Sequence, residues 1–202
     1  MKKYELTNEK KTLAGGTVLR RIRALRDIPR FGVKAGELGG FVEGENNLSQ
    51  DGDAWVSGDA WVYGNACVSG NARVSGYAWV YGNAKVYGNA CVYGYARVSG
   101  NACVSGDACV SGYANVSGNA DVYGDADYTV IKNIWSSGMW FTYTSSNKKW
   151  ADGCFYGTGE ELIKKAYKDS KLSGKCYEAI VHAVETIEAA KAEAKGEYNG
   201  SK

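Results

Sequence analysis

One six-residue phrase fills the middle of the chain and occurs thirteen times between residues 52 and 129. It begins as Gly52–Ser57 (GDAWVS) and ends as Gly124–Thr129 (GDADYT). Gly returns at every sixth position, Ala follows two places later and Val two places after that, except that Tyr128 replaces the last Val. A fixed period of this kind predicts a repeat architecture in which each unit buries its apolar face against its neighbours.

Each phrase predicts a short strand followed by a corner. In Ala-x-Val the alternation of a strand places Ala and Val on one face and x on the other. The Ser/Tyr-Gly-Asn/Asp triplet suits a turn, because Gly and Asn/Asp adopt left-handed backbone angles at low cost. Three such strands and corners close a triangular coil of eighteen residues, with residues i and i+18 about 4.8 Å apart.

Three tyrosines support the eighteen-residue period independently. The position after each Gly is Asp or Asn throughout the repeat, except for Tyr77, Tyr95 and Tyr113. These are separated by eighteen residues each. A simple hexamer repeat gives no reason for that interval, whereas a three-sided coil would place one tyrosine on every turn.

Two phrases, Val62–Ala66 (VYGNA) and Val98–Ala102 (VSGNA), carry an aliphatic residue at i and a small residue at i+4. In this they resemble the hexapeptide repeat of left-handed β-helix proteins, over residues 52–129. The flanks Val33–Glu43 and Cys154–Thr158 look like those of uncharacterised phage and bacterial members of this group. The resemblance implies left-handed coiling, against the usual right-handed crossover, and a homotrimer of helices packed side by side.

Residues 1–51 are expected to form an N-terminal β cap, because the unpaired backbone groups at an exposed end of a β-stack can pair with another chain. Tyr4–Leu6 and Thr17–Leu25 predict two strands, with the turn at either Asn8–Lys11 or Ala14–Gly16. The arginines of this segment favour solvated hairpin edges, with an anion-binding patch as the alternative. These arginines are Arg20, Arg21, Arg23, Arg26 and Arg30.

Residues 130–202 predict an α+β segment. Strands are expected at 131–135, 139–144 and 150–156. A capping box formed by Thr158 and Glu161 predicts a helix that runs to about Leu172 and is ended by Gly174. A second helix is expected over roughly 175–195. Its apolar side would contain Tyr177, Ile180, Val181, Val184 and Ile187.

The outward position x, which the repeat leaves unspecified, is where functional residues are expected. Stacking at intervals of eighteen predicts three columns of outward side chains. They are Trp61, Trp79, Arg97, Asn115; Trp55, Arg73, Cys91, Cys109, Asp127; and Cys67, Lys85, Cys103, Asp121. Three interpretations compete: ladder stacking without a partner, a subunit interface, and a ligand site.

The ligand hypothesis depends on pairs of an aromatic ring and a cation. Trp79 below Arg97, and Trp55 below Arg73, would suit a nucleotide or another planar anion. The predicted ligand-binding residues are Trp55, Arg73, Trp79, Arg97, Tyr77, Tyr95 and Tyr113.

Catalysis is not expected. Many β-helix proteins of this type resemble acetyltransferases, but acyl transfer needs a base, usually His. The lone His182 lies outside the repeat, and no insertion interrupts the thirteen phrases. A Cys154–His182 nucleophile is disfavoured, because Cys is usually a small buried hydrophobe. Stacked Cys91 and Cys109 alone make a weak metal site, so we expect neither cofactor nor metal.

The composition predicts a cytoplasmic protein. No apolar run follows Lys2 and Lys3, so a secretory signal is not expected, and no apolar stretch is long enough to span a bilayer. The six cysteines are expected to be reduced. The net charge is +2 without dense blocks, which argues against membranes and long nucleic acids as partners.

The sequence therefore predicts a non-catalytic, phage-type binding or scaffold protein that sequesters a small anionic or nucleotide ligand in grooves between subunits. A purely structural oligomerisation protein and a hexapeptide-type acyltransferase are the alternatives.

Overall fold

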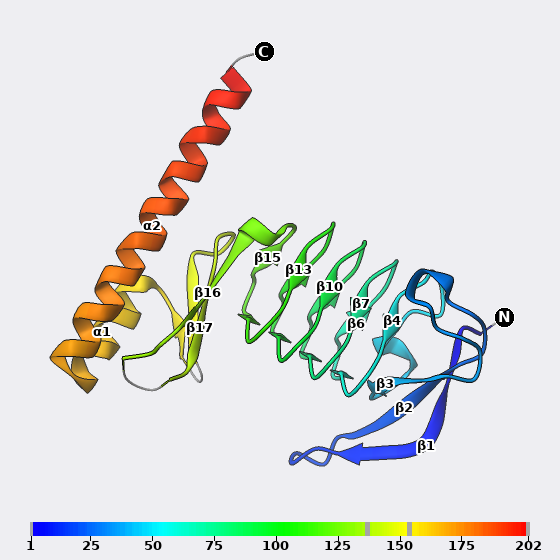
Figure 1. Cartoon of the computed structure of the whole chain (residues 1–202). Helices are drawn as coiled ribbons and strands as arrows, with labels where there is room; N and C mark the ends of the chain where they lie inside the picture. Colours follow the sequence, from blue (N-terminus) through cyan, green and yellow to red (C-terminus); the bar gives the residue numbers. More distant parts are fainter. Residues whose placement is uncertain (1, 136–137, 153–154, 201–202) are drawn as a thin grey trace.

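The computed structural model describes residues 2–135, 138–152 and 155–200, with side chains described up to residue 194. The chain is mainly β, as predicted: a parallel β-solenoid of stacked coils stands between an N-terminal hairpin and a C-terminal segment of strands and helices (Figure 1). The last helix projects away from the coils.

The solenoid consists of two-residue strands on three walls. Parallel pairing joins β5-β8-β11-β14, β4-β7-β10-β13 and β6-β9-β12-β15, always with residue i opposite i+18, as in Trp61 and Trp79. The eighteen-residue coil is therefore confirmed. The strands are β4 (Trp55–Val56), β5 (Trp61–Val62), β6 (Cys67–Val68), β7 (Arg73–Val74), β8 (Trp79–Val80), β9 (Lys85–Val86), β10 (Cys91–Val92), β11 (Arg97–Val98), β12 (Cys103–Val104), β13 (Cys109–Val110), β14 (Asn115–Val116) and β15 (Asp121–Val122).

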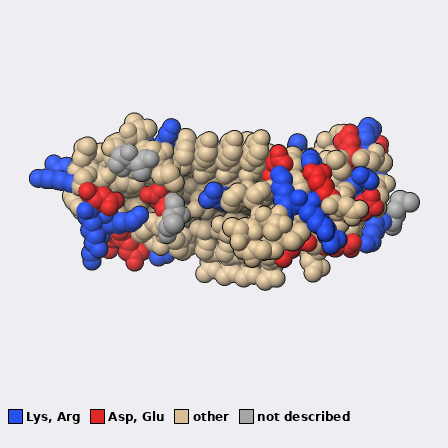
Figure 2. Space-filling model, turned by 90° about the horizontal axis from the view of Figure 1, so that it is seen from below, with Lys and Arg blue, Asp and Glu red and all other residues tan. Residues whose placement is uncertain are grey.

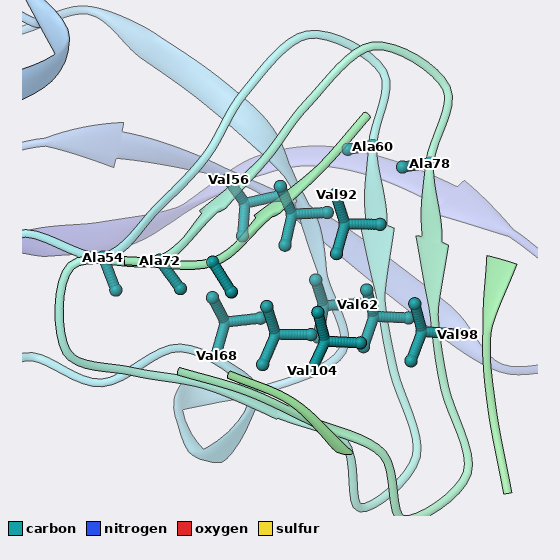
Figure 3. Packing of buried hydrophobic residues seen from close by; sticks show 14 of the residues in the cluster. Ala54, Val56, Ala60, Val62, Val68, Ala72, Ala78, Val92, Val98 and Val104 are labelled. Atoms are coloured by element: carbon teal, nitrogen blue, oxygen red, sulfur yellow. The ribbon is translucent and has the colours of Figure 1, made fainter. Parts of the chain in front are cut away.

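The interior of the coils is lined by the Ala and Val of the first twelve phrases, each at most 1% exposed. Valines from the three walls, such as Val56, Val62 and Val68, point toward one another across the coil (Figure 3). The interior is thus narrow and nearly uniform. Outward side chains are free to vary without disturbing it, which is why the outer columns can carry function.

The coils begin earlier than the repeat. Strand β3 (Leu38–Val42) pairs in parallel with β5, and Leu48 bridges to Val68, so the first coil lies in the segment expected to be a cap. Here Gly40 takes the place of a small core residue, since a Cβ on it would lie 2.7 Å from the carbonyl oxygen of Ala60. No six-residue period marks this coil in the sequence.

At the other end, the thirteenth phrase does not continue the ladder. A 3-10 turn, η3 (Asp125–Asp127), follows β15, and β16 (Tyr128–Lys132) begins an antiparallel sheet. Asp127 therefore leaves the column predicted for it. Its carboxylate instead accepts hydrogen bonds from the N–H groups of Tyr123 and Gly124.

The N-terminal hairpin joins β1 (Tyr4–Thr12) to β2 (Val18–Ala24), and β2 pairs with β3 to extend one solenoid wall. Its turn lies at Leu13–Thr17, the second of the two predicted sites. Two short 3-10 turns follow, η1 (Pro29–Phe31) and η2 (Glu45–Asn47). Ion pairs of Arg21 with Glu9 and of Arg23 with Glu5 match the solvated-edge interpretation.

Both ends of the ladder leave backbone groups without a partner in a neighbouring coil. A parallel strand has N–H and C=O groups along each edge, and at the N-terminal end side-chain donors pair with carbonyl groups. Lys3 Nζ donates to the Ala54 carbonyl at 2.7 Å, and Arg26 donates to that of Gly52 at 2.9 Å. Unpaired buried carbonyls would cost free energy, so these donors close the stack.

At the C-terminal end a side-chain oxygen accepts from one N–H group on each wall, and Tyr128 Oη donates to the Cys109 carbonyl at 2.8 Å. Thr142 Oγ1 accepts from Asn115 at 2.8 Å, Ser146 Oγ from Asp121 at 2.7 Å, and Asp125 Oδ1 from Cys109 at 2.9 Å. The antiparallel sheet thereby covers an edge that could otherwise pair with another chain.

Lys3 should make stability depend on pH. Burial, and secondarily the charge of Arg26, lower the pKa of its ammonium to about 8, against 10.5 for the ordinary group. Between these values the unfolded chain binds more protons than the native one, so stability should rise with pH. We expect wild type to gain about 1 to 2 kcal/mol between pH 7 and 9.5 relative to Lys3→Met. Urea unfolding of wild type and Lys3→Met over this pH range measures the difference. The prediction would be contradicted if the free energies of unfolding of the two proteins changed with pH in parallel.

The C-terminal segment contains an antiparallel sheet and two helices, in the order β16-β17-β18-β19 and α1-α2. Its further elements are β17 (Trp140–Thr144), β18 (Lys149–Asp152), β19 (Phe155–Gly157), α1 (Gly159–Asp169) and α2 (Lys171–Gly200). The predicted capping box is confirmed, since Thr158 Oγ1 accepts from the Glu161 N–H and Glu161 Oε2 accepts from the Thr158 N–H.

The predicted helix stop at Gly174 is wrong. The break falls at Ser170, whose backbone is extended (φ −167°, ψ 157°), and Gly174 lies inside α2. A Cβ on Gly174 would lie 2.3 Å from the Tyr167 ring, so this glycine allows α1 and α2 to approach. Tyr177, Val181 and Val184 are buried as expected, whereas Ile187 is 55% exposed. No helix in the described part of the chain is both long and apolar enough to cross a membrane.

Candidate functional site: an aromatic groove

A column of stacked side chains runs along the wall formed by β5, β8 and β11. The rings of Trp61 and Trp79 are parallel, with centroids 4.9 Å apart, and the Arg97 guanidinium lies 4.7 Å from the centroid of Trp79. Within the described residues the buried indole nitrogen of Trp61 has no hydrogen-bond partner, so stacking orients this ring. The predicted pairing of Trp79 with Arg97 is thus present.

A second column stands at the neighbouring corner, two residues before the first residue of β8, β11 and β14. Tyr77, Tyr95 and Tyr113 stack with centroids 5.2 and 5.0 Å apart, which confirms the predicted tyrosine ladder. Trp140 from β17 continues it, 5.2 Å from Tyr113. The position of Trp140 could not be predicted from the repeat, because Trp140 lies outside it and comes from an antiparallel sheet.

The two columns line a groove of about 550 Å³ that extends over four coils. We call it the aromatic groove. One end is formed by the ion pair of Lys11 and Asp59, and the other by residues 138–140. Its lining consists of Lys11, Asp59, Trp61, Tyr77, Trp79, Tyr95, Arg97, Tyr113, Asn115, Gly138, Met139 and Trp140.

The groove offers ring edges rather than ring faces. Trp79 lies between Trp61 and Arg97, and Tyr95 lies between Tyr77 and Tyr113, so the faces of these rings are already covered. A ligand therefore cannot stack on Trp79 in the way the sequence suggested. The edge of an aromatic ring is electropositive and its face electronegative, so the columns present mildly positive walls.

Charge within the groove is unevenly balanced. Lys11 Nζ lies 2.9 Å from Asp59 Oδ1, and this hydrogen bond lowers the pKa of the Asp59 carboxyl. Arg97 is exposed, and within the described part of the chain it has no carboxylate at ion-pair distance. On the face seen in Figure 2, the coils carry few charged side chains, which gather over the two end segments. Arg97 is thus an unneutralised cation in apolar surroundings.

Two of the predicted ligand residues, Trp55 and Arg73, lie elsewhere. Trp55 is only 1% exposed and belongs to the buried core, and the Arg73 guanidinium lies 5.6 Å from the Phe31 ring. The N-terminal segment lies against this wall, where Arg30 donates to Asn89 Oδ1 at 3.0 Å. The path of that segment could not be read from the repeat, so the sequence could not show that this column is covered.

The cysteines of the solenoid lie in the columns predicted for them. Cys91 lies opposite Cys109 in the parallel ladder, and Cys103 lies between Lys85 and Asp121. No cluster of three or more potential metal ligands occurs among the described residues. The candidate nucleophile Cys154 lies outside the described residues, and His182 is exposed on α2.

Comparison with known protein families finds one repeat model that matches part of the solenoid. The family model described as YdcK Beta solenoid repeat matches residues 66–82 and 96–112. A comparison with curated proteins gave no match. The matched stretches lie inside the solenoid and include Trp79 and Arg97 of the aromatic groove. Over these residues the chain is similar to a YdcK-type β-solenoid repeat, and its repeat is of the β-helix kind.

Proposed function

We propose that this protein is a non-catalytic β-solenoid that sequesters a small anionic ligand with a planar part, of which a nucleotide is the leading candidate, in the aromatic groove. The observation that carries the proposal is Arg97, a cation without an ion-pair partner in the described structure, which continues the tryptophan column along the aromatic groove.

The size and lining of the groove support this proposal. Ligand sites are typically concave, of about 300 to 1,000 Å³, and mostly apolar with a few polar groups that fix orientation; the groove has about 550 Å³. The planar guanidinium of Arg binds carboxylate or phosphate oxygens through two parallel hydrogen bonds. Arg97 would fix the anion while the surrounding rings bury the rest of the ligand.

The groove belongs to a single chain, whereas the sequence suggested grooves between subunits. A homotrimer remains a prediction from the resemblance, as does a phage origin. For the proposal to hold, any such assembly must leave the aromatic groove open. Sequestration rather than turnover is proposed because the groove offers a cation and ring edges, and its Asp59 is engaged by Lys11.

Arg97→Ala should weaken binding of an anionic ligand. A hydrogen bond to a charged group contributes about 1.5 to 3 kcal/mol, so we expect an affinity loss of roughly 10- to 100-fold. A panel of nucleotides and cyclic nucleotides is screened by thermal shift, and hits are titrated by calorimetry.

Arg73→Ala is the matched control, because Arg73 also projects from a solenoid strand but lies against Phe31. It should bind like wild type. A panel without any hit, or equal behaviour of wild type and Arg97→Ala for every hit, would contradict the proposal. A trimer with occluded tryptophans and no binding would instead support a structural role.

A further inference from the structure

We propose that the ligand is an elongated flat aromatic monoanion that lies lengthwise in the aromatic groove. Its charged end would contact Arg97, and its ring system would extend over the edges of Trp79 and Trp61 toward the Lys11–Asp59 end. This inference rests on the proposed function and specifies the ligand class and its orientation.

The lengthwise orientation follows from the shape of the groove. Its two walls are columns that run along the coil axis, with neighbouring rings 4.9 to 5.2 Å apart. Four coils contribute to the lining, so the groove is about 15 Å long at a strand spacing of about 4.8 Å. A rod-shaped ligand can contact several rings at once only by lying along this axis.

Flatness and aromaticity follow from the ring edges. Because neighbours cover the faces of Trp79 and Tyr95, a ligand meets their electropositive edges. The electronegative face of an aromatic ligand complements such edges, and edge-to-face contacts contribute about 0.5 to 1.5 kcal/mol beyond the buried area. A saturated ring of similar size lacks this electrostatic term.

The orientation follows from the order of residues in the tryptophan column. Trp61 and Trp79 occupy its first two positions, followed by Arg97 and Asn115. The half of this column that lies toward Lys11 is therefore apolar, and its other half is polar. Lys11 is already paired with Asp59 and competes less for an anion. From Arg97 to Trp61 is two coil spacings, about 10 Å, which corresponds to two linked rings.

Calorimetric titration with three probe anions tests the ligand class. Biphenyl-4-carboxylate has two aromatic rings, benzoate has one, and 4-cyclohexylcyclohexanecarboxylate has two saturated rings. We expect biphenyl-4-carboxylate to bind at least about tenfold more tightly than either of the other two, and to lose this binding in Arg97→Ala.

Two substitutions at equivalent corners test the orientation. Tyr77→Asn removes a ring beside the proposed aromatic body, and Tyr113→Asn removes one on the other side of Arg97. Asn already occupies the same position of the next corner at Asn83 and Asn101, so both variants should fold. We expect Tyr77→Asn to weaken the binding of biphenyl-4-carboxylate roughly fivefold, and Tyr113→Asn to weaken it less than about twofold.

The outcomes separate this inference from the proposed function. The inference would be overturned if anions bound in an Arg97-dependent way without any preference for the biphenyl probe. It would also be overturned if Tyr113→Asn lost more affinity than Tyr77→Asn. Either result would leave the proposed function standing. Failure of the three probes and of the nucleotide panel to show any Arg97-dependent binding would overturn both. Thermal unfolding of each variant confirms that the compared proteins are folded.

Discussion

Gly100→Ala is expected to destabilise the protein by about 2 to 4 kcal/mol. Gly100 has a φ of +67°, and a Cβ on it would lie 2.9 Å from both the backbone nitrogen and the carbonyl oxygen of Gly118 in the next coil. The side chain would thus strain its own backbone and press on a neighbour that is itself backbone. Urea unfolding of wild type and variant measures the loss.

Gly112→Ala separates the two causes. Gly112 has nearly the same φ, +64°, but nothing lies within 4 Å of a Cβ placed on it. Only the backbone strain should remain, at a cost of about 1 kcal/mol. Equal losses at the two positions would show that close packing of successive corners is not what requires glycine at Gly100.

Asn47→Asp is expected to cost at least about 3 kcal/mol at pH 7. Asn47 is 2% exposed, and its Nδ2 donates to the carbonyls of Gly64 and Ala66 at 2.9 and 2.8 Å, while its Oδ1 accepts from the Gly44 N–H. A carboxylate would place a buried charge against two carbonyl oxygens. The cost arises because these two carbonyls would lose their donor.

The loss should shrink in acid. Repulsion by the carbonyls and burial would raise the pKa of the introduced carboxyl, so the native variant binds more protons than the unfolded chain and loses stability as pH rises. Asp127→Asn is the matched control at the opposite end, where the side chain accepts N–H groups and an amide oxygen still can. We expect about 1 kcal/mol there. Urea unfolding of both variants at pH 5 and pH 7 measures these losses of stability. Equal losses in Asn47→Asp and Asp127→Asn would contradict the capping roles assigned to the two residues.

The repeat allowed the solenoid and its columns to be predicted because inward and outward positions alternate within each phrase. The interval between Tyr77, Tyr95 and Tyr113 indicates a coil of eighteen residues. The neighbours of Trp79 and Arg97 in adjacent coils are then the residues eighteen positions away. Backbone hydrogen bonding fixes this register, so it needs no knowledge of the flanks.

What the sequence could not predict depends on the flanks. Burial of Trp55 requires knowing that the N-terminal segment returns to that wall, and Lys11 and Trp140 reach the groove from opposite ends of the chain. The first coil was missed for a related reason. Gly40 is needed there because the backbone of Ala60 approaches it closely. Asn47 is needed because the Gly64 carbonyl requires a donor. Neither constraint produces a six-residue period.

The most direct test of the binding site is fluorine NMR of protein labelled with fluorotryptophan, titrated with biphenyl-4-carboxylate. Trp61, Trp79 and Trp140 line the aromatic groove, whereas Trp55 and Trp150 are each 1% exposed and lie outside its lining, which makes them internal controls. Single Trp→Phe variants assign the resonances. We predict saturable shifts of Trp61 and Trp79 with Trp55 and Trp150 unchanged; saturable shifts confined to Trp55 or Trp150, or none at any tryptophan, would contradict a ligand site in this groove.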